Sequence, residues 1–143
     1  MTTEPPQDAT SDPLRHRAYA DAIAERAAGQ LRDLLRTLVA EIDPFPPFPG
    51  AMFAYGIEFD PPAGSAYGCV VLGDDAQLYE FVIGLDDEQI AGGGDHVAAR
   101  NEELLKLDDE LAPADYVAFA HRAVAAAVEY LEGQRSEAAA GQG

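Results

Sequence analysis

Apolar residues recur at helical spacing through the first third of the chain, and this pattern predicts one long helix. Asp12 followed by Pro13 is typical of a helix start, because the aspartate can cap the first turn and proline is preorganised for its first position. Pro44 ends the helix, since proline disfavours the helical conformation of the residue before it. The periodic positions are Ile23, Ala27, Leu31, Leu34, Leu35, Leu38 and Ile42.

The length of this helix has a consequence for the shape of the protein. A rise of about 1.5 Å per residue gives a rod of about 45 Å. A compact domain of this size should be only roughly 35 Å across. Part of the helix therefore extends beyond the rest of the protein, unless it breaks at Gly29.

The next stretch, PFPPFPG from Pro44 to Gly50, favours a polyproline II conformation with three residues per turn. Phe45 and Phe48 would then project from the same side. The prolines fit the PxxP spacing of a docking peptide for another protein. The acidic neighbour Asp43 and the cost of exposing two phenylalanine rings favour a second interpretation, an internal strut that buries both rings.

Alternating apolar positions then predict three strands, at residues 52–59, 66–73 and 78–85. The connections DPPAGS and DDAQ are short and rich in turn residues, which suits antiparallel hairpins. Residues 86–101 form a weakly structured excursion, and 102–107 is either a strand or the end of a short helix, with the strand favoured. A last helix begins near Pro113 and ends before Gly133.

These elements predict an α+β fold in the order α-β-β-β-(β)-α. An antiparallel meander of three to four strands carries the long N-terminal helix and the C-terminal helix on one face. The chain of 143 residues suits one domain, which we place at residues 12–133. Residues 1–11 and 134–143 lack apolar periodicity, so we expect disordered tails there.

The charge is strongly negative, with 26 acidic against 9 basic residues and a net charge of −17. Residues 43–114 hold 15 acids against Arg100 and Lys106, whereas the first helix is close to neutral. Such a field repels nucleic acids and anionic membranes, so we expect neither as a direct partner. The charge alone does not separate a functional role from the composition of a saline or high-GC host. The polar N-terminus and the absence of a long apolar run indicate a cytoplasmic protein.

Residues with catalytic or ligand chemistry form no motif that identifies an activity. The serines fit no nucleophile motif, and Cys69 lies in an apolar, acidic setting that suits a small core residue. His16 and His121 lack ligand spacing. Asp95, His96 and Glu102 are weak candidates for a metal site, without a recognised pattern. We therefore expect no cofactor, and an enzyme is less favoured than a binding protein.

The sequence thus favours a small acidic intracellular protein with a non-catalytic role in interaction or regulation. We expect a homodimer through the N-terminal helix, at Ile23, Ala27 and Leu31, because this near-neutral region lets two acidic chains meet. One alternative is a small-molecule binder or enzyme with a pocket between sheet and helices, lined by Tyr55, Tyr67, Tyr79 and Phe81. A second alternative is an acidic nucleic-acid mimic, which needs its acids arrayed along one face.

Overall fold

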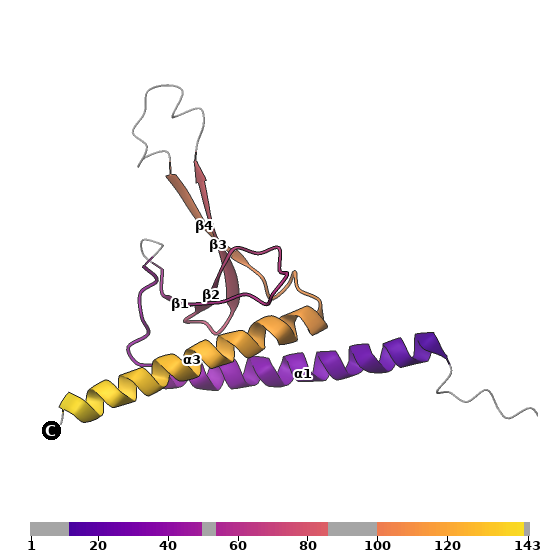
Figure 1. Cartoon of the computed structure of the whole chain (residues 1–143), viewed down its shortest axis with the longest axis horizontal. Coiled ribbons are helices and arrows are strands. Elements are labelled where there is room, and N and C mark those ends of the chain that lie inside the picture. Colours follow the sequence, from indigo (N-terminus) through magenta and orange to yellow (C-terminus); the bar gives the residue numbers. More distant parts are fainter. Residues whose placement is uncertain (1–11, 50–53, 86–99, 142–143) are drawn as a thin grey trace, which may run out of the picture.

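The computed structural model of the chain describes residues 12–49, 54–85 and 100–141 (Figure 1). Four antiparallel strands form one sheet in the order β1-β2-β3-β4, and α1 precedes it while α3 follows it. The predicted α+β fold is therefore confirmed, and residues 102–107 belong largely to a strand. The elements are α1 (Pro13–Glu41), β1 (Gly56–Phe59), β2 (Cys69–Gly73), β3 (Leu78–Leu85), β4 (Arg100–Lys106) and α3 (Pro113–Gly141).

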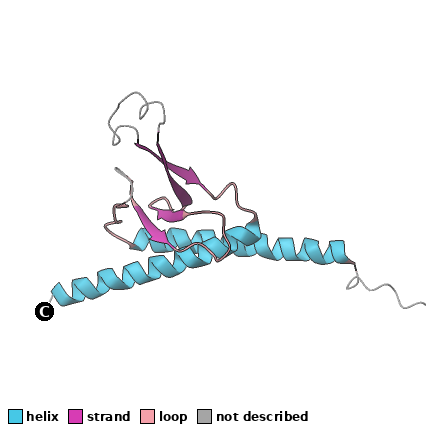
Figure 2. Ribbon diagram, turned by 45° about the horizontal axis from the view of Figure 1, so that its top comes forward, coloured by secondary structure: helices cyan, strands magenta, loops and turns pink. Residues whose placement is uncertain are grey.

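The two helices lie side by side and form one layer beneath the sheet (Figures 1 and 2). They run in the same direction but are staggered, so the start of α1 projects at one end and the end of α3 at the other. The Asp12 side chain caps α1 by accepting a hydrogen bond of 3.1 Å from the Leu14 amide. The helix passes through Gly29 without a break. Of the two alternatives for this long helix, the structure therefore has the extension beyond the body.

The main core lies between the helix layer and one face of the sheet. Alternate strand residues supply it, as the register shows: Ile57 is opposite Leu72, and Phe59 is opposite Val70. Helix residues close it from below, with small side chains on α3 that allow the helices to approach closely. These helix residues include Ala28, Leu35, Val39, Ala120, Ala123, Ala127 and Leu131.

The proline stretch packs against the other face of the sheet, which we call the outer face. The Phe48 amide donates to the Ala54 carbonyl at 2.9 Å, and the Gly56 amide donates to the Pro46 carbonyl at 3.0 Å. The ring of Phe48 is 4% exposed and meets Phe81 edge-on at 5.1 Å between centroids. The segment is thus an internal strut.

The expectation that Phe45 and Phe48 project from the same side onto one surface was wrong. Phe45 is partly buried against the main core, whereas Phe48 is buried over the outer face, outside that cluster. The reason is that Pro47 forms a β-bridge with Tyr55, so the backbone here follows a strand partner rather than a free threefold helix.

The predicted end of the last helix at Gly133 was also wrong, because α3 continues to Gly141. Residues 134–141 are thus helical where a disordered tail was expected. Glycine costs a helix only about 1 kcal/mol, and the residues after it reach the end of α1. Gln134 donates to the Pro44 carbonyl at 3.0 Å, and Arg135 lies 3.9 Å from Glu41. The other predicted tail, residues 1–11, lies outside the described residues.

Candidate interaction surface

A line of apolar side chains follows the exposed side of α1. Ile23 is 70% exposed and Tyr19 is 54% exposed, and Leu34 continues the line along the helix. Positions 19, 23, 27 and 34 repeat at intervals of four and seven, so they share one side of the helix. We call Tyr19, Ile23, Ala27 and Leu34 the α1 stripe. The buried residues Leu35 and Val39 lie on a neighbouring side that faces the core.

The structure separates the three residues that the sequence proposed for this surface. Ile23 is the most exposed of them, Ala27 is half-buried, and Leu31 packs against the main core. Sequence reasoning missed Tyr19 and Leu34, although both follow the same spacing. The apolar pattern of α1 is wider than one contact surface, so periodicity alone does not tell which edge faces the sheet.

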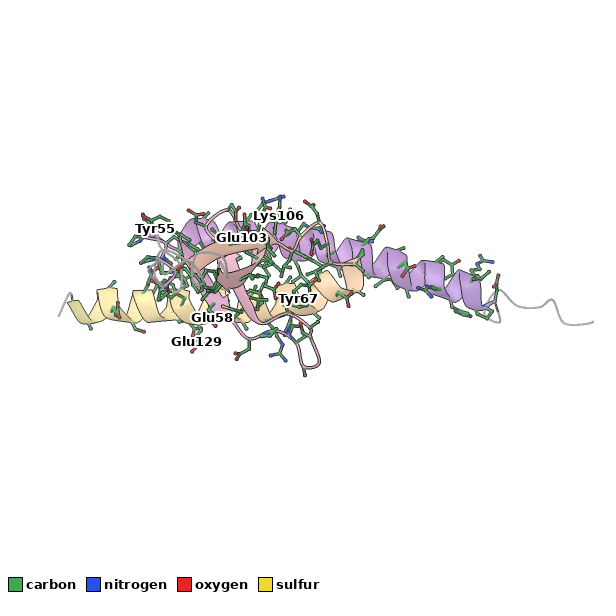
Figure 3. All side chains as sticks on the ribbon, turned by 90° about the horizontal axis from the view of Figure 1, so that it is seen from above. Tyr55, Glu58, Tyr67, Glu103, Lys106 and Glu129 are labelled. Carbon is green, nitrogen blue, oxygen red and sulfur yellow. The ribbon has the colours of Figure 1, made fainter. Side chains whose placement is uncertain are left out.

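The first turns of α1 have little tertiary support. Residues 12–23 are exposed, and the helix extends past the sheet in the view from above (Figure 3). Local contacts supply part of the support: Arg15 lies 5.6 Å above the Tyr19 ring and donates to its hydroxyl at 3.1 Å. Isolated helices of about 12–15 residues are marginal in water. A surface that covers this segment would therefore stabilise it.

The acids of the protein are poorly neutralised by its own cations. Ion pairs such as Arg36–Asp33 at 3.2 Å and Lys106–Asp109 at 3.9 Å involve exposed side chains. Exposed pairs contribute roughly 0–1 kcal/mol each. They do little against the mutual repulsion of 26 acids.

We expect the free energy of unfolding to rise when NaCl is increased from a few millimolar to about 0.1 M, where the screening length is about 10 Å. The reason is that salt weakens repulsion between acids that lie farther apart than this. Urea unfolding at a series of NaCl concentrations measures the effect, with sucrose as a control for effects unrelated to charge. A flat or falling curve would show that bound cations already compensate the acids.

A groove of about 500 Å³ lies between β1 and α3. Glu58 and Glu129, both labelled in Figure 3, line it together with Asp60 and Arg122. Three acids against one cation repel one another across the groove, and Ala125 and Ala126 form part of its wall. This arrangement supplies acceptors but no nucleophile.

The aromatic pocket expected between sheet and helices is not formed by the four residues proposed for it. Tyr67 packs edge-on against Phe119 of α3, at 5.6 Å between ring centroids. Tyr55 and Tyr79 line a hollow of about 320 Å³ on the outer face instead. Figure 3 shows Tyr55 and Tyr67 at opposite ends of the sheet. Strand alternation explains the separation, because neighbouring aromatic positions need not point to the same face.

A polar cluster joins α1 to the sheet and to the start of α3. Arg32, Lys106 and Asp108 line its cavity of about 200 Å³. An oxygen of Asp108 accepts from the Leu78 amide at 2.7 Å. Burial raises the pKa of this carboxyl, whereas the backbone hydrogen bond and the charges of Arg32 and Lys106 lower it. Arg32 also lies 4.4 Å above the ring of Tyr116. These contacts give the cluster a structural role in holding three elements together.

Cys69 lies at the start of β2 and is half-buried on the outer face, not in the main core. Its Sγ is 3.5 Å from a carboxylate oxygen of Glu58. Burial, followed by the hydrogen bond and charge of Glu58, raises the pKa of the thiol to about 11. Because the thiolate is the nucleophilic form, Cys69 is a poor nucleophile near neutral pH.

The structure provides no support for the weak metal candidates. Asp95 and His96 lie outside the described residues, and Glu102 lies on β4. Within the described ranges, no group of three or more histidine, cysteine, aspartate or glutamate side chains could hold a metal ion. Neither helix in this part of the chain has a stretch long and apolar enough to cross a membrane.

No protein-family model matches the chain, and neither a curated protein nor a solved structure shows significant similarity to it. Function is therefore inferred from the surfaces of this chain alone.

Proposed function

We propose that the chain is a non-catalytic interaction or regulatory protein of the cytoplasm that self-associates through the α1 stripe. The observation that carries this proposal is the 70% exposure of Ile23 on a helix that projects beyond the body. Soluble monomers seldom leave extended apolar surface uncovered. Tyr19 and Leu34 extend the exposed surface on either side of Ile23.

The occupant of this surface is a second copy of the chain. Residues 13–27 carry Arg15, Arg17 and Arg26 against Asp21 and Glu25, so the segment is nearly neutral in a chain of net charge −17. Two copies that meet here avoid most of the repulsion that the acidic remainder would impose. A two-fold arrangement lets the same stripe serve both partners.

The energetics fit a dimer of moderate affinity. Full burial of an isoleucine-sized side chain contributes about 1.5–3 kcal/mol, and the two-fold doubles the contribution of each stripe residue. Association also costs several kcal/mol of lost freedom. Ordering of the first turns of α1 lowers the net gain further. We therefore expect a dimer that forms at micromolar concentrations.

The substitution Ile23→Asp is expected to convert this dimer into a monomer. It places a charge at the centre of the stripe, where no cation is positioned to pair with it. Ala18→Asp is the matched control, because position 18 is also exposed but lies about 140° around the helix from Ile23. Light scattering at micromolar concentration should give about twice the chain mass of 15.2 kDa for the wild type and for Ala18→Asp.

Circular dichroism of both variants checks that the helices remain folded, as expected for substitutions at exposed positions. A wild type that stays monomeric at every salt concentration would refute the α1 dimer. Equal effects of Ile23→Asp and Ala18→Asp would show that added charge, and not the stripe, decides the outcome.

A further inference from the structure

The outer edge of β4 is a second surface with a defined geometry. β4 pairs with β3 from Tyr79 opposite Lys106 to Leu85 opposite Arg100, and it is the last strand in the sheet order. Pairing between β2 and β3 ends at Cys69 opposite Phe81. Beyond that point β3 and β4 form a two-stranded ribbon that rises away from the helices in Figure 1. Two-stranded ribbons are marginally stable, and open edges readily pair with other strands.

The backbone direction shows which groups of β4 face its outer edge. The Leu107 amide donates to the Leu78 carbonyl at 2.8 Å, so at position 107 the backbone points toward β3. Backbone groups of a strand alternate in direction. The amides and carbonyls of Glu102, Leu104 and Lys106 therefore point to the outer edge. Their side chains share the outer face of the sheet with Phe81, which is opposite Leu104.

We propose that β4 pairs in antiparallel fashion with β4 of a second copy, with the two-fold axis at Leu104. In this register Leu104 is opposite the partner's Leu104, and Glu102 is opposite the partner's Lys106. The pairing forms six backbone hydrogen bonds from the three outward-facing residues of each copy. It joins the two four-stranded sheets into one continuous sheet.

The distribution of charge selects this register. Opposite charges on directly facing residues stabilise a strand pair, and like charges destabilise it. With the axis at Glu102, at Glu103 or at Lys106, the central residue would face its own copy and place like charges together. The axis at Leu104 instead gives two pairs of opposite charge around an apolar centre. Lys106 is available for such a pair, since its contact with Asp109 is long, at 3.9 Å, and exposed.

The charge on β4 also permits close approach. Arg100 and Lys106 balance Glu102 and Glu103, so the strand is neutral within the acidic segment 43–114. Glutamate and lysine on an edge strand commonly act against pairing with arbitrary strands. Here the same residues make the edge complementary to itself, which confers specificity for a second copy.

This contact is independent of the proposed α1 dimer and uses a different part of the molecule. Two distinct two-fold contacts link copies into closed tetramers or into longer assemblies. The α1 contact can be removed with Ile23→Asp, which leaves the β4 contact as the remaining source of association. The two interfaces can therefore be tested separately.

In the Ile23→Asp background, we expect sedimentation velocity to show a concentration-dependent dimer. Adding Lys106→Glu should weaken this dimer at least about tenfold, because both facing pairs become like-charged. Combining Lys106→Glu with Glu102→Lys should restore the affinity, since the charges are exchanged but again opposite. Lys106 is exposed, so circular dichroism should show all of these variants folded.

A cross-link tests the register directly in a Cys69→Ser background. Hydrogen-bonded partners in antiparallel strands have Cα atoms about 5.5 Å apart, within the range of a disulfide. Leu104→Cys should therefore form a disulfide-linked dimer in oxidised glutathione. Leu105→Cys should not, because its copies would be offset along the strands by about 7 Å.

Each outcome decides between the two proposals. If Ile23→Asp is monomeric at all concentrations, the β4 inference is overturned and the α1 dimer stands. A dimer that ignores Lys106→Glu, or that the charge exchange does not restore, also overturns the β4 inference, even if an extended segment of another protein binds this edge. A wild-type dimer split by Lys106→Glu but not by Ile23→Asp supports β4 pairing and refutes the α1 contact.

Discussion

Replacing Phe48 with alanine is expected to lower the free energy of unfolding by about 3–5 kcal/mol. The ring is 4% exposed and rests on Phe81. Backbone hydrogen bonds at Phe48 and Gly56 hold the strut at a fixed distance from β1. Gly56 itself lies against Val71, where an added Cβ would collide with the valine side chain. The surroundings are thus too constrained to close the cavity left by the ring. Urea unfolding followed by circular dichroism measures the loss.

Tyr55→Ala provides the control for this prediction. Tyr55 lies next to the strut and forms the β-bridge with Pro47, but its side chain is 55% exposed. Its loss should cost less than about 1 kcal/mol. If Phe48→Ala kept its stability but lost binding to another protein, the proline stretch would be a docking peptide instead of a strut.

The sequence predicted the elements whose signals are local. β3 was predicted with its observed bounds, because alternation is complete from Leu78 to Leu85 and turn residues precede it. The start of α1 followed from Asp12 and Pro13. β2 is shorter than predicted because its first residues lack a ladder partner: the Gly68 amide donates to the Glu80 carboxylate at 3.0 Å. Propensity reports whether a segment can be a strand, but not where its neighbour ends.

Features that depend on distant parts of the chain were beyond the sequence. The rings of Phe45 and Phe48 diverge because the strut pairs with residues near β1. Leu31 faces the core while Leu34 is exposed, because the position of the sheet decides which side of α1 is covered. The proposed site was therefore correct in its helix and in Ile23, but not in its full set of residues. The self-complementary edge of β4 required the strand register, which no local pattern supplies.

The substitution of Tyr116 is expected to have opposite effects depending on what replaces it. Tyr116→Ala should lower the free energy of unfolding by about 3–5 kcal/mol, because its ring is 0% exposed and lies between the α1 guanidinium of Arg32 and the core. The smaller residue also removes the surface on which Arg32 stacks, and that guanidinium would then border an apolar cavity.

Tyr116→Phe should instead leave the stability unchanged or raise it by about 1 kcal/mol. The hydroxyl is buried and has no hydrogen-bond partner among the residues that the structure describes. Burial, together with the nearby charge of Asp108, raises the pKa of the phenol to about 12, so the group stays neutral and unpaired at ordinary pH. Phenylalanine keeps the ring and its contact with Arg32 while it removes the unsatisfied oxygen.

Thermal and urea unfolding of the wild type, Tyr116→Ala and Tyr116→Phe in one buffer measure the ring and the hydroxyl separately. The difference between the two variants reports the packing of the ring, and the difference between the wild type and Tyr116→Phe reports the hydroxyl. A loss above about 1 kcal/mol in Tyr116→Phe would contradict an unpaired hydroxyl. It would place a bound water or a small polar ligand beside Asp108, and it would give the polar cluster of Arg32, Lys106 and Asp108 a binding role in addition to its structural one.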